Sequence, residues 1–179
     1  MWENGARPDI GNKRGNSALH VATRGGHFDI AKLLFENGAR LDIANKRGNT
    51  AMHTAARSGH TAILEFLYEN GARLDIANKY GNTALHFAAR SGHTEIGKFL
   101  IEKGVGLNVG NRDGDTPLHF AARSGFTEFA KLVIESGATI DIANKYGDTA
   151  LHWAICYGHT DLVMLFTEKC AKSDQFPTP

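Results

Sequence analysis

One nine-residue phrase returns along this chain at intervals of 33 residues. It reads Asn-Lys-Arg-Gly-Asn-Thr-Ala-Met-His at 45–53, and its related copies end at His20, His86, His119 and His152. No insertion or deletion separates the copies, which is typical of an array of similar structural units. Because a unit of this size cannot bury a hydrophobic core alone, neighbouring copies have to stack against each other.

The copy at 78–110 indicates the local structure that each unit should adopt. A turn-forming segment at 78–82 precedes Thr83, whose hydroxyl suits a helix N-cap. A short helix is predicted over 84–91 and ends at Gly92. A second helix is predicted from 94 up to Gly104. Each copy is therefore expected to be a helix-turn-helix unit.

Apolar residues in each second helix follow the spacing i, i+3, i+4, which places them on one helix face. We predict that this stripe is buried, and that Leu100→Ala or Leu132→Ala destabilises the protein by about 2–5 kcal/mol. The stripes are Ile30/Leu33/Leu34, Ile63/Phe66/Leu67, Ile96/Phe99/Leu100, Phe129/Leu132/Val133 and Leu162/Leu165/Phe166.

The segment Thr116-Pro117-Leu118-His119-Phe120-Ala121 resembles the T-P-L-H-x-A signature of ankyrin repeats, and the period agrees. The resemblance covers roughly residues 3–171 and implies an all-α repeat solenoid, in which β-hairpin-like loops join stacked helix-turn-helix repeats. We expect the end of a truncated preceding repeat at 1–11. Five repeats should follow at 12–44, 45–77, 78–110, 111–143 and 144–171, with a tail at 172–179.

Composition limits the classes of function. Residues 1–90 carry 12 Lys and Arg against 8 Asp and Glu, whereas residues 91–179 carry 8 against 11. This excess of positive charge is too small for a dedicated nucleic-acid binder, which usually has a strongly basic face. The chain has no signal peptide and no apolar run long enough to cross a membrane, and its two cysteines fit a reducing compartment. We therefore expect an intracellular protein, cytoplasmic and/or nuclear, without a membrane partner.

The nine histidines do not indicate a metal site or catalysis. Five belong to the repeated phrase and four follow a glycine between the helices, so all are part of the repeat framework. Successive copies should lie roughly 10 Å apart, whereas zinc ligands lie about 2 Å from the metal. Cys156 has no histidine specifically paired with it, and no phosphate-loop motif is present. We predict no enzyme activity, no metal and no cofactor.

The resemblance implies that hairpin tips and first helices line the binding side of the array. One arginine recurs in each of four first helices and forms an arginine ladder (Arg24, Arg57, Arg90 and Arg123). Beside it runs a row of first-helix side chains, one per repeat, that become aromatic toward the C-terminus. Arg, Trp and Tyr are enriched at interface hot spots, although the ladder could equally be a solvated part of the scaffold. The predicted partner-binding residues are Lys46, Arg47, Asn49, Arg57, Lys79, Tyr80, Asn82, Phe87, Arg90, Arg112, Phe120, Arg123, Tyr146, Trp153 and Tyr157.

The function predicted from these features is that of a protein–protein interaction module, monomeric as this segment. One alternative is binding of an anionic ligand or nucleic acid by the arginine ladder, which predicts steep salt dependence. A second alternative is a structural or regulatory arm of a larger protein. A third interpretation is that the near-identical repeats come from recent duplication or consensus-like design. It is less favoured than the other two, because a designed array usually carries deliberate polar caps at both ends.

Overall fold

The computed structural model describes residues 7–173, and the side chains up to residue 169. Part of the predicted segment 1–11 and most of the tail 172–179 therefore lie outside the described residues. The chain forms two compact units, Met1–Ala88 and Ala89–Pro179. The boundary between them falls inside one helix.

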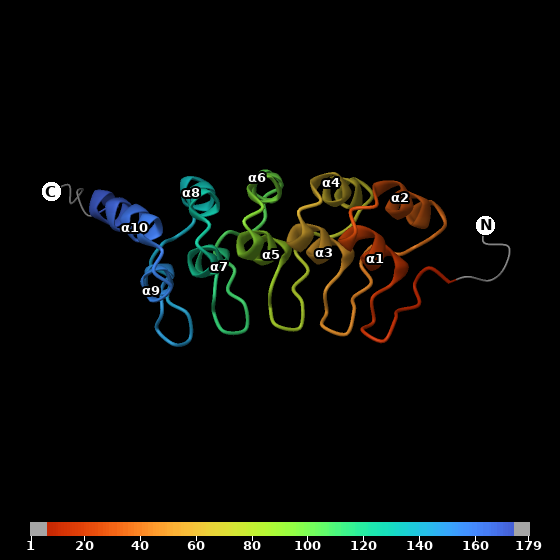
Figure 1. Ribbon diagram of the computed structural model, residues 1–179, viewed down its shortest axis with the longest axis horizontal. Helices are drawn as coiled ribbons and strands as arrows, with labels where there is room; N and C mark the ends of the chain where they lie inside the picture. Colours follow the sequence, from red (N-terminus) through yellow and green to blue (C-terminus); the bar gives the residue numbers. More distant parts are fainter. Residues whose placement is uncertain (1–6, 174–179) are drawn as a thin grey trace. The chain divides into compact units, whose positions relative to one another are not determined.

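Residues 7–173 contain ten helices and no strand, arranged as repeated helix-turn-helix pairs (Figure 1). The predicted all-α repeat fold class is thereby confirmed. The helices are α1 (Ala18–Arg24), α2 (Phe28–Glu36), α3 (Ala51–Ser58), α4 (Thr61–Glu69), α5 (Ala84–Ser91), α6 (Thr94–Glu102), α7 (Pro117–Ser124), α8 (Thr127–Glu135), α9 (Ala150–Cys156) and α10 (Thr160–Ser173).

The histidine of the repeated phrase holds the start of each first helix. In α3, Nδ1 of His53 accepts a hydrogen bond from the Thr50 backbone N–H at 3.1 Å and lies 2.9 Å from the Thr50 hydroxyl. The threonine oxygen in turn accepts from the helix backbone, which makes a reciprocal capping box. Because Nδ1 accepts, Nε2 carries the proton and donates to the Asn82 carbonyl at 3.1 Å. One ring thus caps its own helix and binds the next loop.

The loops before the first helices have β-hairpin-like hydrogen bonds without forming strands. The Asn45 N–H donates to the Asn49 carbonyl at 2.9 Å, and the Asn45 side-chain oxygen accepts from the backbone N–H groups of Arg47 and Asn49. The preceding loop is attached as well, since the Lys46 N–H donates to the Arg14 carbonyl at 3.2 Å. Each loop is therefore fixed both internally and to its neighbour within the unit.

The buried face of the second helices differs from the predicted stripe. In α4, Ile63, Leu64 and Leu67 are at most 2 % exposed, whereas Phe66, which the i, i+3, i+4 stripe includes, is only half-buried. The core spacing is thus i, i+1, i+4, because α4 also packs against α3, the first helix of its own pair, as α2, α8 and α10 pack against α1, α7 and α9. The residue at i+1 fills that contact.

The same correction applies to other second helices. Leu132 in α8 is half-buried, while Ala130, absent from the predicted stripe, is fully buried. In α2, Ile30 and Leu33 are about half exposed, and Leu34 is the one member of its predicted stripe that is buried. Phe66 packs edge-on against Phe28 of α2, with ring centroids 5.5 Å apart, so this i+3 side chain contacts the neighbouring second helix and stays partly exposed.

Candidate functional site

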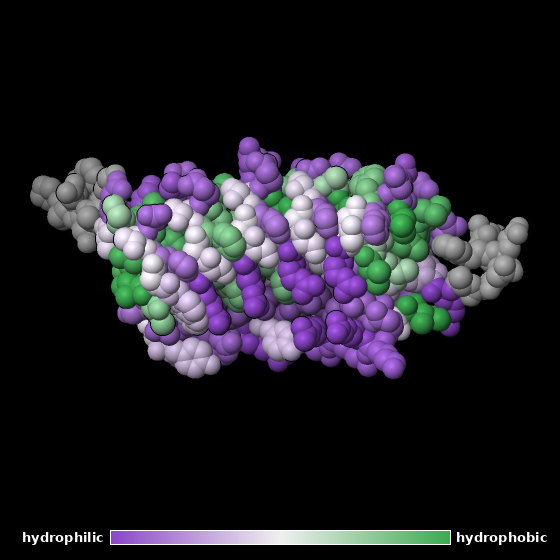
Figure 2. Space-filling view, in the orientation of Figure 1, coloured by the Kyte–Doolittle hydropathy of each residue, from purple (hydrophilic) through white to green (hydrophobic). Residues whose placement is uncertain are grey.

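The hairpin tips carry exposed side chains in both units. Lys46, Arg47, Lys79 and Tyr80 are exposed in the first unit, and Arg112 and Tyr146 are exposed in the second. Within each unit, Figure 1 shows the loops on one side of the first helices and the second helices on the other side. Because the loop backbones are hydrogen-bonded, these side chains project from fixed positions. Figure 2 shows hydrophilic side chains gathered over the loops of the first unit.

Two predicted loop residues, Asn49 and Asn82, face inward. Asn49 is buried, its side-chain oxygen accepts from the Asn78 side-chain amide at 2.7 Å, and its carbonyl accepts from His20. Asn82 is half-buried and its carbonyl accepts from His53. These contacts give both asparagines a structural role. Whether either meets a partner stays a prediction.

The predicted first-helix positions divide into two kinds. Arg57, Arg90 and Arg123 are exposed, whereas Phe87, Phe120 and Trp153 are half-buried. One part of each half-buried ring packs against the protein, and the other part is exposed to solvent. Phe87, for example, packs edge-on against His53 with ring centroids 5.5 Å apart.

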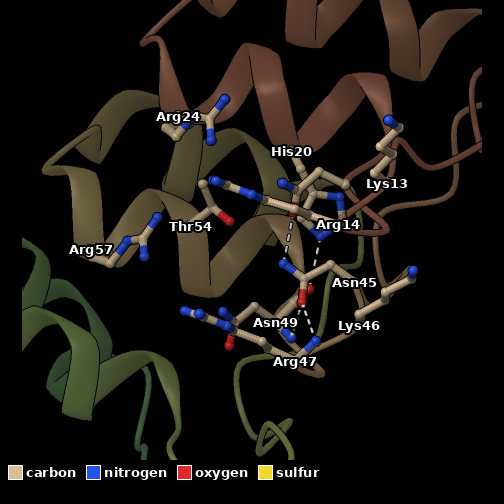
Figure 3. Close-up of a pocket in the computed structure, with 11 residues that line it drawn as sticks. Lys13, Arg14, His20, Arg24, Asn45, Lys46, Arg47, Asn49, Thr54 and Arg57 are labelled. Atoms are coloured by element: carbon tan, nitrogen blue, oxygen red, sulfur yellow. Dashed lines mark hydrogen bonds between the residues drawn. The ribbon is translucent and has the colours of Figure 1, made fainter.

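The first unit contains a cavity of about 390 Å³ that is strongly basic (Figure 3). We call it the basic cavity. Six of its eleven lining residues are cations, none is acidic, and none is aliphatic. The cations come from two successive loops and the two first helices that follow them: Lys13, Arg14, Arg24, Lys46, Arg47 and Arg57.

The remaining lining residues of the basic cavity are neutral, and most of their polar groups are hydrogen-bonded within the protein. The Asn45 side-chain amide donates to the Asn16 side-chain oxygen at 2.7 Å, and the Thr54 hydroxyl donates to the Thr50 carbonyl. Burial lowers the pKa of His20, an effect that the hydrogen bond to the Asn49 carbonyl partly opposes. The neutral ring adds no charge near pH 7, so the potential of the cavity comes from Arg and Lys.

Aromatic residues and one arginine form a stack in the second unit. The Arg123 guanidinium lies 5.0 Å from the Trp153 ring and 5.5 Å from the Tyr157 ring. The Trp153 and Tyr157 rings are nearly parallel with centroids 5.9 Å apart, and His159 stacks on Tyr157. This stack (Arg123, Trp153, Tyr157 and His159) combines cation–π contacts with an exposed aromatic surface. Such groups are typical interface anchors.

The edge of this stack forms a second hollow, of about 310 Å³, lined by Asp148, His152, Trp153, Cys156 and Tyr157. The Trp153 indole N–H is buried and has no hydrogen-bond partner among the described residues. An unpaired buried donor costs free energy and is available to an acceptor that could reach it. The Cys156 thiol is exposed and forms no disulfide.

Among residues 7–173 no group of three or more His, Cys, Asp or Glu side chains could hold a metal ion. Over the same residues, no helix has the length and apolar character needed to span a bilayer.

Sequence reasoning assigned the site incompletely. The structure brings Lys46, Arg47, Asn49 and Arg57 together in the basic cavity, and Trp153 and Tyr157 together at the second hollow. Phe120 and Arg123 line a smaller depression with Trp153. Arg14 and Arg24 were missing from the predicted set although they line the basic cavity. The repeated dibasic pair, Lys13-Arg14 and Lys46-Arg47, was the signal that could have included Arg14, and the arginine ladder was the signal that could have included Arg24.

The comparison with protein families agrees with the geometry. A family model described as ankyrin repeats (3 copies) matches residues 1–78, 40–113, 70–144 and 106–176. The chain therefore belongs to the ankyrin-repeat family. No curated protein matched the chain in a sequence search. Ankyrin repeats are generally protein–protein interaction modules, and proteins built from them are typically non-enzymatic.

Proposed function

We propose that this chain binds another protein through its exposed hairpin tips and first helices. The observation that carries the proposal is the fixed display of interface-type side chains on hydrogen-bonded loops, with Tyr80 54 % and Tyr146 74 % exposed. A rigid surface loses little conformational entropy on association, which favours affinity. The tips need no such residues for stacking, because the repeat core is built by the helices.

The proposed partner presents different chemistry to each unit. Cations dominate the tips of the first unit, which suits an acidic or mixed segment of the partner. In the second unit the aromatic stack of Trp153 and Tyr157 suits an apolar or aromatic anchor. We further propose that the protein is monomeric and intracellular, either cytoplasmic or nuclear, on the basis of its composition.

A pull-down from cell lysate at two salt concentrations tests this proposal. The test variant carries Arg47→Glu, Arg57→Glu and Arg90→Glu on the tips and first helices. The matched control carries Lys32→Glu, Lys98→Glu and Lys131→Glu on the second helices, so that both variants change the net charge equally. Circular dichroism should first establish equal helix content. We expect the test variant to lose specific partner proteins that the wild type and the control retain.

Two results would contradict the proposal. Capture of the same proteins by the test variant and the wild type would place the binding surface elsewhere. Recovery of nucleic acid that disappears at high salt would instead favour electrostatic binding of a polyanion by the arginine ladder.

A further inference from the structure

The basic cavity of the first unit brings four guanidinium groups toward one space. Figure 3 shows the Arg14 side chain extending from its loop in the direction of Arg24 and Thr54. In the same view Arg47 extends from the following loop in the direction of Arg57. Lys13 and Lys46 project toward the opposite side of the loops. The arginines therefore border the cavity from two loops and two helices.

Five of the six cations that line the cavity have no acidic partner among the described residues. Among the described residues, no ion pair joins Lys13, Arg14, Arg24, Lys46 or Arg47 to an acid. The two loop arginines are held in place through their backbones, since the Arg14 N–H donates to the Asn12 side chain and the Arg47 N–H to the Asn45 side chain, both at 2.9 Å. Like charges that border one space repel one another, and a bound anion would relieve this repulsion.

The side chains that line the cavity also limit which chemical groups a bound anion can have besides its negative charges. Guanidinium forks match the oxygen pairs of phosphate groups in bidentate hydrogen bonds. No aliphatic side chain lines the cavity, and its one ring, that of His20, is 3 % exposed with both nitrogens already hydrogen-bonded. A nucleobase would therefore find no aromatic ring to stack on, and an apolar side chain would find no aliphatic surface.

We propose that the basic cavity binds a small, densely phosphorylated molecule that has no aromatic or apolar body, such as a polyphosphorylated polyol or a short polyphosphate. The volume of about 390 Å³ lies within the range of ordinary small-ligand sites. Several phosphate groups on one compact molecule would engage several arginines at once. A single monovalent anion would engage fewer and bind more weakly.

The second unit supplies an internal comparison. The positions of Arg14 and Arg47 in the repeat are occupied there by Asp113 and Tyr146, and the position of Arg57 is occupied by Cys156. Only Arg24 has an arginine, Arg123, at its corresponding position. The same backbone framework thus carries no cluster of arginines in the second unit. The basic cavity is therefore a property of particular side chains in the first two repeats, and the fold alone does not create it.

Isothermal titration calorimetry on the purified full chain tests the proposal, with inorganic tripolyphosphate and inositol hexakisphosphate as probes. We expect one binding site per chain, with affinity that falls as salt increases. The variant Arg14→Gln/Arg47→Gln should weaken binding by about tenfold or more, because charge-assisted hydrogen bonds are lost. The matched control Arg112→Gln/Lys145→Gln removes the same charge from tips of the second unit and should stay within about twofold of the wild type.

Several results would overturn the proposal. Absence of saturable binding would do so, as would equal weakening in the two double variants, which would indicate diffuse attraction to a cationic protein. Tighter binding of ATP than of tripolyphosphate would show that the site recognises a base. Binding of a doubly phosphorylated peptide without binding of either probe would assign the cavity to a protein ligand. Because the titration uses no protein partner, its outcome is independent of the pull-down.

Discussion

At the residue scale, His53 of the repeated phrase is a structural group whose neutral form the fold requires. His53 is 2 % exposed and hydrogen-bonded through both ring nitrogens, one of which must accept. Burial lowers the pKa of His53 to about 4, and hydrogen bonds to backbone carbonyls oppose the shift only in part. Protonation of the ring would remove the acceptor that completes the helix cap.

The lowered pKa predicts a stability loss in mild acid. The folded pKa of about 4 lies below the unfolded value of 6.5, so between these pH values the unfolded chain binds more protons. Stability from this group is complete above pH 6.5 and falls as pH falls toward about 4. Between pH 7.5 and 5 we expect the free energy of unfolding to fall by about 2 kcal/mol through His53 alone.

Urea unfolding of the wild type, His53→Gln and the exposed-histidine control His27→Gln at these two pH values checks this. The His53→Gln protein should be less stable at pH 7.5 and should lose about 2 kcal/mol less on acidification than the wild type. The control should follow the wild type. Identical pH dependence of all three proteins would show that His53 titrates normally in the folded state.

Glycine at one repeat position is required by both its backbone angle and its neighbour. Gly92 has a φ of +71°, and a Cβ atom there would lie 2.4 Å from Cδ1 of Phe126. At the equivalent contact in the first unit, His60 lies against Gly26 and its ring donates to the Arg24 carbonyl. Phe126 fills the same space without this hydrogen bond, which explains how phenylalanine replaces histidine in one copy.

Gly92→Ala should therefore destabilise the protein more than Gly104→Ala, whose φ is +78° but whose added Cβ would meet nothing within 4 Å. We expect the control to lose about 1 kcal/mol for the backbone angle and Gly92→Ala to lose about 1–3 kcal/mol more from overpacking. Chemical denaturation of both proteins measures the difference. Equal losses would mean that the Phe126 ring moves aside at no cost.

At the element scale, the sequence predicted the helix pairs well because each has explicit local signals. The helix predicted over 84–91 is α5 (Ala84–Ser91), and the one predicted from 94 is α6 (Thr94–Glu102). The buried face was predicted less well. Periodicity shows that a helix has an apolar side, but the small residues Gly97 and Ala130 give almost no hydrophobic signal although both are fully packed.

The corrected core face changes the expected effect of two truncations. Leu100 is completely buried, so Leu100→Ala should cost about 2–5 kcal/mol of unfolding free energy. Leu132 is half-buried, so Leu132→Ala should cost less than half as much. Denaturant melts of the two variants separate these effects. A larger loss for Leu132→Ala would contradict the i, i+1, i+4 core face.

At the scale of the whole molecule, the uneven distribution of charge along the sequence corresponds to a cluster of cations in the first unit. The excess of Lys and Arg in residues 1–90 includes the six cations that line the basic cavity. Sequence reasoning found the dibasic tips and the arginine ladder separately. It could not show that loop and helix arginines border one space, because their proximity depends on the fold and on side-chain direction. The stacking of Arg123 on Trp153 and Tyr157 depends on tertiary packing in the same way.

Position-specific photo-crosslinking tests most directly whether the protein binds its partner through the tips and first helices. A photoreactive residue replaces Tyr80 or Tyr146 on the tips, or Leu33 or Met164 on the second helices. All four positions are more than half exposed, at 54, 74, 51 and 64 %, so accessibility does not distinguish the two pairs. We predict that a partner recovered with the wild-type chain crosslinks at a tip position and at neither second-helix position. Crosslinking of that partner at Leu33 or Met164, without crosslinking at the tips, would contradict the account.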